Sequence, residues 1–219
     1  MSMIGWVLGV SPAQIEALRA EPTLAGDMSM IAAHDRIEIR SRKMMARLPP
    51  HKQAEAEARF RERETAPYFK DAQAEWAKAR ERLATVGPLE PALDLEKSWH
   101  VLHYLLTGNV GPTAPPADLL LTGEELGGDV GYGPVRLHDA SATRAFADFL
   151  EGLDAPTLVG RVNIDELQQA GVYGIPMGPS PKAEFQRELQ AEAESFLPQL
   201  RDYVAAMAEK QNGLLVWLS

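Results

Sequence analysis

The chain has 219 residues, of which 45% are hydrophobic and 24% are charged, a composition typical of one globular domain with a real core. It contains no cysteine, which excludes disulfides, zinc–thiolate sites, iron–sulfur clusters and cysteine nucleophiles. The formal net charge is −9, with basic residues interleaved among acidic ones, so we expect no nucleic-acid partner; the acidity serves either solubility or the attraction of a basic partner.

The N-terminal residues predict a strand at 3–10 and then a helix. The segment "SPAQ" places Ser11 as the N-cap, Pro12 at the first helical position and Gln14 where it completes a capping box, and Pro22 follows the helix. The apolar run "MIGWVLGV" has no basic region before it and is too short for a signal peptide. Because no segment approaches the ~18 apolar residues of a membrane span, we expect a cytoplasmic protein that does not enter a membrane.

Residues 27–48 have a helical composition and end at two consecutive prolines. At spacings of four, three and four residues they carry a mostly apolar stripe, consisting of Ile37, Ser41, Met44 and Leu48.

Residues 51–83 predict a helical arm with a charged, solvated face and a narrow apolar one. Pro67 should break or kink this arm near Thr65. After the break, Phe69 and Trp76 lie seven residues apart on one helical face, which is enough to dock against another part of the chain or against another subunit.

The segment 93–108, "LDLEKSWHVLHYLLTG", predicts a helix that is capped by Asp94 and stopped by Gly108. On a helical wheel, Trp99 falls inside the apolar arc formed with the valine and leucines, and His103 lies at its border.

Glu96, His100 and His103 share the sector just beyond this arc, and two interpretations of them are open. The first is a metal or acid–base site, since residues three and four apart lie on one helical face. The second is structural, with Trp99 and His103 packed at the core border and His100 paired with Glu96 on the rim. The structural interpretation is favoured, because catalytic zinc needs further ligands and the H-E-x-x-H pattern is absent. We therefore predict no metal and no cofactor.

Residues 107–133 are rich in glycine and proline and predict a loop, with one short helix where Thr122 and Glu125 match a capping box. The glycines of "GGDVGYGP" precede a predicted strand at 134–138 instead of a helix, which argues against a phosphate loop. Tyr132 stands between two of these glycines, and its hydroxyl projects either into a cleft or onto the core.

The rest of the chain predicts, in order, a helix capped by Asp139 or Ser141 that runs to about Leu153, a strand at 157–163, a helix from Asn163 to Gly171, a long helix at 182–211 with Pro198 inside it, and a strand at 214–219. Helices exceed strands and do not alternate with them regularly. We therefore predict an α+β fold with a small mixed sheet, built from the N-terminal strand, the strand near 134–138 and the C-terminal strand.

Five blocks, "MSMIGWVLGVSPAQIEAL", "LDLEKSWHVLHYLLTG", "GYGPVRLHDASATRAFADFLEGL", "AGVYG" and "NGLLVWLS", together resemble the YfbM-like (DUF1877) family of bacterial proteins of unknown function. The resemblance covers roughly residues 1–24 and 93–219. It implies a single α+β domain over 1–219, and it implies no activity. The segment at about 34–88 departs from the family and is interpreted as a helical insertion. Where the family reads "GIYP", this chain reads "GVYGIP", so the tyrosine stands and the proline is displaced.

Three functions are open at this point. The first is a non-enzymatic binding or interaction protein with a protein partner, suggested by the acidity, the lack of a complete catalytic constellation and the arm. The second is a small-molecule-binding protein or an enzyme, in which the glycine-rich loop and the histidine helix converge on a cleft around Trp99, His103, Tyr132 and Arg136. The third and weakest is metal binding through the acid and the two histidines described above. The sequence predicts neither a reaction nor an oligomeric state.

Overall fold

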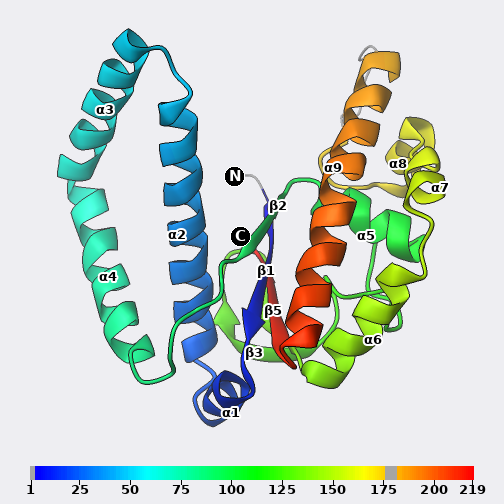
Figure 1. Ribbon diagram of the computed structural model, residues 1–219, viewed down its shortest axis with the longest axis horizontal. Helices are drawn as coiled ribbons and strands as arrows, with labels where there is room; N and C mark the ends of the chain where they lie inside the picture. The colour runs from blue at the N-terminus through cyan, green and yellow to red at the C-terminus, as the bar shows by residue number, and fades with distance from the viewer. Residues whose placement is uncertain (1–2, 176–181) are drawn as a thin grey trace.

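The first and last strands of the chain lie side by side in a five-stranded sheet of order β2-β1-β5-β4-β3 (Figure 1). The structure is a computed structural model and describes residues 3–175 and 182–219. The strands are β1 (Gly5–Val10), β2 (Leu93–Glu96), β3 (Glu124–Asp129), β4 (Pro134–His138) and β5 (Gly213–Leu218).

The predicted α+β class is confirmed, but the prediction of a mixed sheet is wrong, because every neighbouring pair of strands is antiparallel. The connection from β4 to β5 explains why. The chain leaves β4 at His138, and the helices that follow return it to the same end of the sheet, where His138 pairs with Leu214 at the start of β5. A strand that enters the sheet where its neighbour ends must run in the opposite direction.

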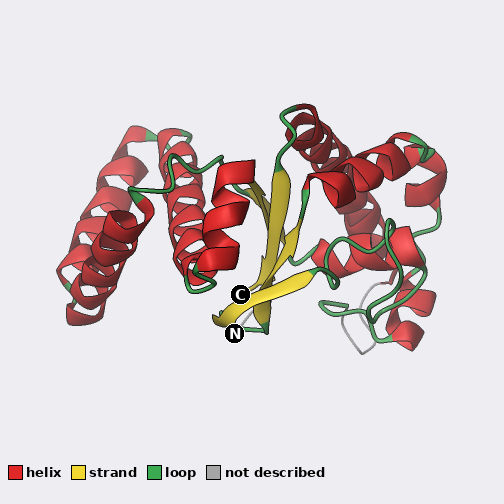
Figure 2. Cartoon of the chain, turned by 90° about the horizontal axis from the view of Figure 1, so that it is seen from below, coloured by secondary structure: helices red, strands yellow, loops and turns green. Residues whose placement is uncertain are grey.

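Helices cover both faces of the sheet, so that the molecule has three layers (Figure 2). One layer consists of α1 (Pro12–Ala20), α2 (Leu24–Ala46), α3 (Pro50–Thr65) and α4 (Pro67–Leu83). The other consists of α5 (Trp99–Thr107), α6 (Ala140–Glu151), α7 (Ala155–Gly160), α8 (Ile164–Ala170) and α9 (Lys182–Glu209).

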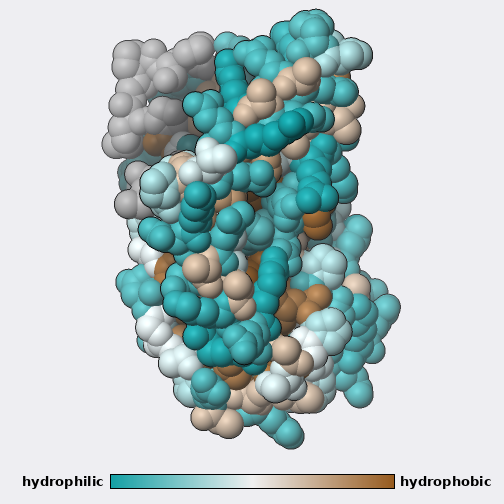
Figure 3. All heavy atoms as spheres, turned by 90° about the vertical axis from the view of Figure 1, so that its left-hand side faces the viewer, coloured by the Kyte–Doolittle hydropathy of each residue, from teal (hydrophilic) through white to brown (hydrophobic). Residues whose placement is uncertain are grey.

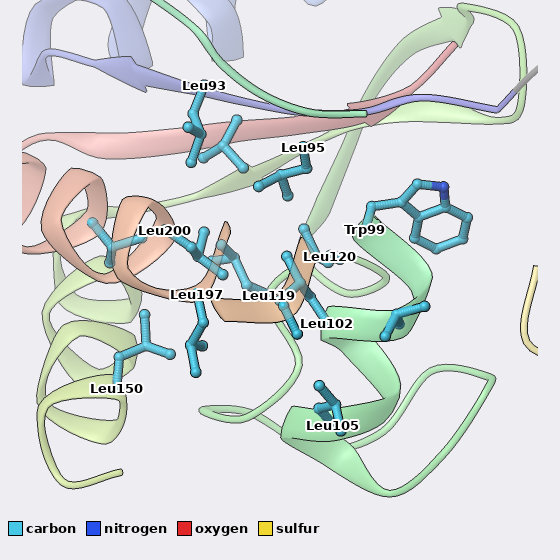
Figure 4. Close-up of a cluster of buried hydrophobic side chains, with 14 of the residues drawn as sticks. Leu93, Leu95, Trp99, Leu102, Leu105, Leu119, Leu120, Leu150, Leu197 and Leu200 are labelled. Atoms are coloured by element: carbon cyan, nitrogen blue, oxygen red, sulfur yellow. The ribbon is translucent and has the colours of Figure 1, made fainter. Parts of the chain in front are cut away.

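Side chains alternate across the sheet and feed two separate cores. In β1, Trp6 and Leu8 pack on the α2 side, whereas Val7 between them packs on the α9 side. Trp6 also faces Trp217 of β5, with parallel rings whose centroids lie 5.9 Å apart. On the opposite face, leucines from β2, α5, the following loop, α6 and α9 converge beneath the sheet (Figure 4). Burying a leucine fully contributes about 2 kcal/mol of hydrophobic free energy, so these two clusters supply most of the driving force for this arrangement.

Local capping signals place several helix ends where the sequence predicts them. At the start of α1, Ser11 and Gln14 form both hydrogen bonds of the capping box. Asp139 accepts a hydrogen bond from the first turn of α6, and Asn163 does the same for α8. The predicted break near Thr65 is confirmed, since α3 ends there and α4 begins at Pro67.

The helix predicted from Asp94 begins only at Trp99, and residues 93–96 form strand β2. The edge of β1 explains the difference, because β2 pairs with it while Leu93 and Leu95 enter the α9-side core. Asp94 accepts a hydrogen bond from the Glu96 backbone at 2.9 Å, so it closes the end of the strand instead of capping a helix.

Two further predictions are wrong. Residues 124–129 form strand β3 and not a helix, because they pair with β4 in a hairpin, and the Thr122 hydroxyl donates to the Asp118 carbonyl instead of capping a helix. Residues 155–160 form helix α7 and not a strand, because Pro156 lies in a first helical turn whose Leu158 is buried.

The helix α2 extends beyond the sheet that its first half covers. Its residues 24–32 supply the buried contacts, whereas no residue of 33–46 is fully buried. Helices α3 and α4, which we call the arm, return antiparallel to α2 (Figure 1). The arm is held mainly through three buried residues of α4, and its outward face is mostly hydrophilic (Figure 3). Among the described helices, none is long and apolar enough to cross a membrane.

Candidate functional site

A cleft of about 700 Å³ lies between α2, the arm and the end of the sheet at which β5 ends. It is lined by α2 residues between Gly26 and Ser41, by side chains of α3 and α4, and by Val130 and Trp217 of the sheet layer. We call this cleft the α2 groove. Its volume is in the range of small-molecule and cofactor sites, which is about 300–1,000 Å³.

Small residues keep the floor of the α2 groove open. Gly26, Ala33 and Ser41 recur at helical spacing along the face of α2 that points into the cleft. Ile37 lies among them and is 49% exposed, so it presents aliphatic surface to the groove.

Aromatic side chains form the arm wall of the groove. Phe60 comes from α3, and Phe69 and Trp76 come from α4. The rings of Phe69 and Trp76 meet edge to face with centroids 5.5 Å apart. The ring of His34 on α2 lies 3.8 Å from that of Trp76, so the arm contacts α2 through this pair.

The charged side chains that line the groove besides His34 are both carboxylates, Glu38 and Glu64. Among the side chains that the structure describes, neither a lysine nor an arginine lines it. Glu38 is paired with Arg42 one turn further along α2. Glu64 makes no ion pair with any described side chain.

One group of donors near the groove could hold a metal ion by geometry alone. Ligand atoms of His34, Asp35 and Glu38 lie within 4.8 Å of one another. Both carboxylates are already engaged by arginines, Asp35 by Arg80 at 2.5 Å and Glu38 by its neighbour on α2. A cation would have to compete with these guanidinium groups, so the arrangement is that of a structural ion-pair network.

The histidines of the α5 helix fasten the loop that follows it. His100 Nε2 donates to the Val110 carbonyl at 2.9 Å, and its Nδ1 accepts from the Tyr173 backbone at 2.8 Å. His103 Nε2 donates to the Gly111 carbonyl at 3.1 Å, and its ring is only 1% exposed. Burial lowers the pKa of His100, which fits a neutral ring that donates through one nitrogen and accepts through the other.

The structure does not bring Glu96 to these histidines. Glu96 is on β2 and not on the helix, and its carboxylate lies 2.7 Å from Arg40 of α2. The expected pairing of Glu96 with His100 is therefore wrong. Among the described residues, the three donors of the proposed metal site do not form a cluster.

The remaining residues singled out from the sequence lie outside the α2 groove. Trp99 is 3% exposed and stacks on His100, and its indole nitrogen has no hydrogen-bond partner within the described residues. Arg136 on β4 lies 3.7 Å from Glu125, and its buried Nη1 also has no partner there. Tyr132 is 37% exposed in the β3–β4 turn, where its backbone N–H donates to the Leu218 carbonyl.

Sequence reasoning missed the α2 groove, although two of its signals were visible. The apolar stripe on α2 contained Ile37 and Ser41, both of which line the groove, and the arm carried Phe69 and Trp76. What the sequence could not show is that these two faces meet beside Trp217, which comes from the opposite end of the chain.

Comparison with known proteins fits this fold. A model of the family described as "Domain of unknown function (DUF1877)" matches residues 1–217. The chain belongs to the DUF1877 family. Among solved structures it is similar to YfbM from Escherichia coli, a protein of unknown function, with 17% sequence identity, a TM-score of 0.54 and coverage of 99% of each chain. No curated protein gave a match.

Membership of the DUF1877 family confirms the resemblance seen in the sequence, and the YfbM structure shares the fold. Neither the family description nor the description of the YfbM structure states an activity. That this DUF1877 chain is one domain with a helical insertion at 34–88 stays a prediction. Its function must be argued from the geometry of its own residues.

Proposed function

We propose that this DUF1877 protein is a non-enzymatic binding protein that holds a protein partner in the α2 groove. The observation that carries the proposal is the combination of an apolar floor, exposed at Ile37, with an aromatic wall formed by Phe69 and Trp76. The core of a protein interface is typically apolar and surrounded by a polar rim. Aromatic side chains are also enriched where protein partners bind.

Two features support binding over catalysis. The carboxylates beside His34 are held by arginines, so this histidine has no free general base next to it on α2. The buried imidazoles of α5 and β4 donate to loop carbonyls and act as structural fasteners. Nucleic acid is not proposed as the partner, because no lysine or arginine lines the groove within the described part of the chain. A cytoplasmic location belongs to the proposal and can be tested by cell fractionation.

Two isoleucines on α2 give a matched pair for the test. Ile37 lines the groove and is 49% exposed, whereas Ile39 is 44% exposed and does not line it. Partners are recovered with the tagged full chain, identified by mass spectrometry, purified, and titrated against the wild type, Ile37→Ser and Ile39→Ser. We expect Ile37→Ser to weaken binding about tenfold, because the lost apolar burial amounts to about 1–2 kcal/mol. We expect Ile39→Ser to bind like the wild type.

Equal affinity of the wild type and Ile37→Ser for every purified partner would contradict the proposal. So would the absence of any partner with a Kd below about 100 µM, since weaker association does not distinguish a site from chance contact.

The second candidate is small-molecule binding around Trp99, His103, Tyr132 and Arg136. It is favoured by the two buried donors without partners, the Trp99 indole and Arg136 Nη1, because unpaired buried donors call for an acceptor. A thermal-shift screen with carboxylate and phosphate metabolites tests it. The expected result is a ligand that stabilises the wild type and not Arg136→Gln, and a blank screen of the wild type removes this candidate.

A further inference from the structure

We infer that the partner segment received by the α2 groove is a basic amphipathic helix, with an apolar stripe flanked by lysines. This inference rests on the proposed function, because it names the chemistry of the occupant of the same groove.

The length of the floor fits a helical segment. The floor runs along α2 from Gly26 to Ser41, which at 1.5 Å per residue is about 22 Å, or four helical turns. A helix of this length presents four or five apolar side chains at positions i, i+3, i+4 and i+7 along one face. A small molecule would occupy only part of such a floor.

The lining fits an apolar stripe. Gly26, Ala33 and Ser41 leave room for a second helix to approach α2, since close helix packing is easiest over small residues. Ile37 supplies an aliphatic contact in the middle of the floor, and Trp217 closes the side towards the sheet.

The charge at the rim fits lysine. Glu64 is half-buried in the arm wall, one helical turn after Phe60, and makes no ion pair with any described side chain. A carboxylate in a cleft that aromatic side chains also line suits an alkylammonium group, which pairs with the acid while its methylene chain and charge lie against the aromatic faces. The net charge of −9 on the whole chain would attract a basic segment towards the groove.

The probe is a fluorescently labelled synthetic peptide of 15 residues (about the length of the floor) made of leucine, lysine and alanine, with leucine at i, i+3, i+4 and i+7. Two controls are the same peptide with glutamate in place of lysine, and a peptide of the original composition in scrambled order. Fluorescence anisotropy is measured with the full chain at low and high salt. We expect the lysine peptide to bind at least tenfold more tightly than either control and to weaken as salt is raised.

Two matched variants locate the charge. Glu64→Gln should weaken the lysine peptide about two- to fivefold, as expected for a partly exposed ion pair, and should leave the glutamate peptide unaffected. Glu62→Gln is the control, because Glu62 lies on the same helix but is exposed and does not line the groove. Ile37→Ser should weaken the lysine peptide as well.

The outcomes separate this inference from the proposed function. If the lysine and glutamate peptides bind equally well and both are weakened by Ile37→Ser, the groove is a docking site and the inference about charge is overturned. The inference of a helical partner is overturned if a small organic cation such as butylammonium saturates the groove while the peptides do not bind. It is also overturned if the chain forms a dimer that Ile37→Ser dissociates. If no peptide binds and Ile37→Ser leaves the affinity of the purified natural partner unchanged, both fail.

Discussion

Replacing His100 by leucine tests whether the histidines of α5 serve structure. Leucine has a side chain of size comparable to histidine, which suits this 8%-exposed position, but it lacks both ring nitrogens. The bonds to the Val110 carbonyl and from the Tyr173 N–H are lost, at 2.9 and 2.8 Å. Each such bond contributes about 0.5–1.5 kcal/mol, so the free energy of unfolding at pH 7.5 should fall by about 1–3 kcal/mol.

The pH dependence gives a second readout of the same variant. Burial lowers the pKa of His100 below the usual 6.5; the bond to the Val110 carbonyl opposes this shift, and the nearby His103 adds to it. Because the unfolded chain then takes up the proton first as pH falls, the contribution to stability is fully present above about pH 6.5 and is lost below it. The variant should therefore lose less stability than the wild type between pH 7 and pH 5.

Urea denaturation followed by circular dichroism at several pH values measures both effects. His138 is the internal reference, since its pKa is also lowered by burial and its contribution persists in the variant. A loss below about 0.5 kcal/mol at pH 7.5, together with an unchanged pH slope, would show that this imidazole is not a structural fastener, and a chemical role for the α5 histidines would regain support.

Two further predictions concern how the layers are held. Gly213→Ala should destabilise the chain by about 1–3 kcal/mol, because an added Cβ would lie 2.4 Å from the His138 carbonyl oxygen. The control is Gly26→Ala, whose added Cβ meets nothing within 4 Å, so it should be neutral or slightly stabilising in thermal unfolding. Equal melting temperatures for the two variants would contradict the packing described for Gly213. Asp27→Asn should loosen the end of the arm, because the 6%-exposed Asp27 accepts a hydrogen bond from Arg82 Nε at 2.6 Å. We expect faster amide hydrogen exchange in α4 of the variant. Unchanged exchange would mean that this ion pair does not fix the arm.

Local signals in the sequence were sufficient for elements whose ends are decided by nearby residues. The capping box at Ser11, the caps at Asp139 and Asn163 and the break at Pro67 involve partners within a few positions, so composition alone locates them. The α+β class follows from the same elements.

The edge strands could not be predicted in the same way. β3 has the sequence "EELGGD", whose glycines and acids are poor strand formers, and it exists because β4 pairs with it. β2 does alternate as "LDLE", but its pairing with β1 bridges most of the first half of the chain. The helical pattern of the residues that follow led us to predict one helix over 93–108, and Glu96 was therefore placed on a helix instead of on β2.

The α2 groove shows the same limit for function. Its floor, its aromatic wall and Trp217 come from three parts of the sequence, and each part taken alone is typical of an ordinary packed face. The chemically conspicuous histidines, by contrast, attract attention in the sequence but in the structure bond to the loop after α5.

The most direct test of the central claim is a map of where the basic amphipathic peptide binds. Backbone amide shifts of the isotope-labelled full chain are followed by NMR during titration with the lysine peptide. We predict that the largest shifts fall in α2 between Gly26 and Ser41 and in the arm around Trp76. Shifts concentrated around Trp99 and His103 of α5, with α2 unaffected, would contradict the account and move the binding site to the opposite face of the sheet.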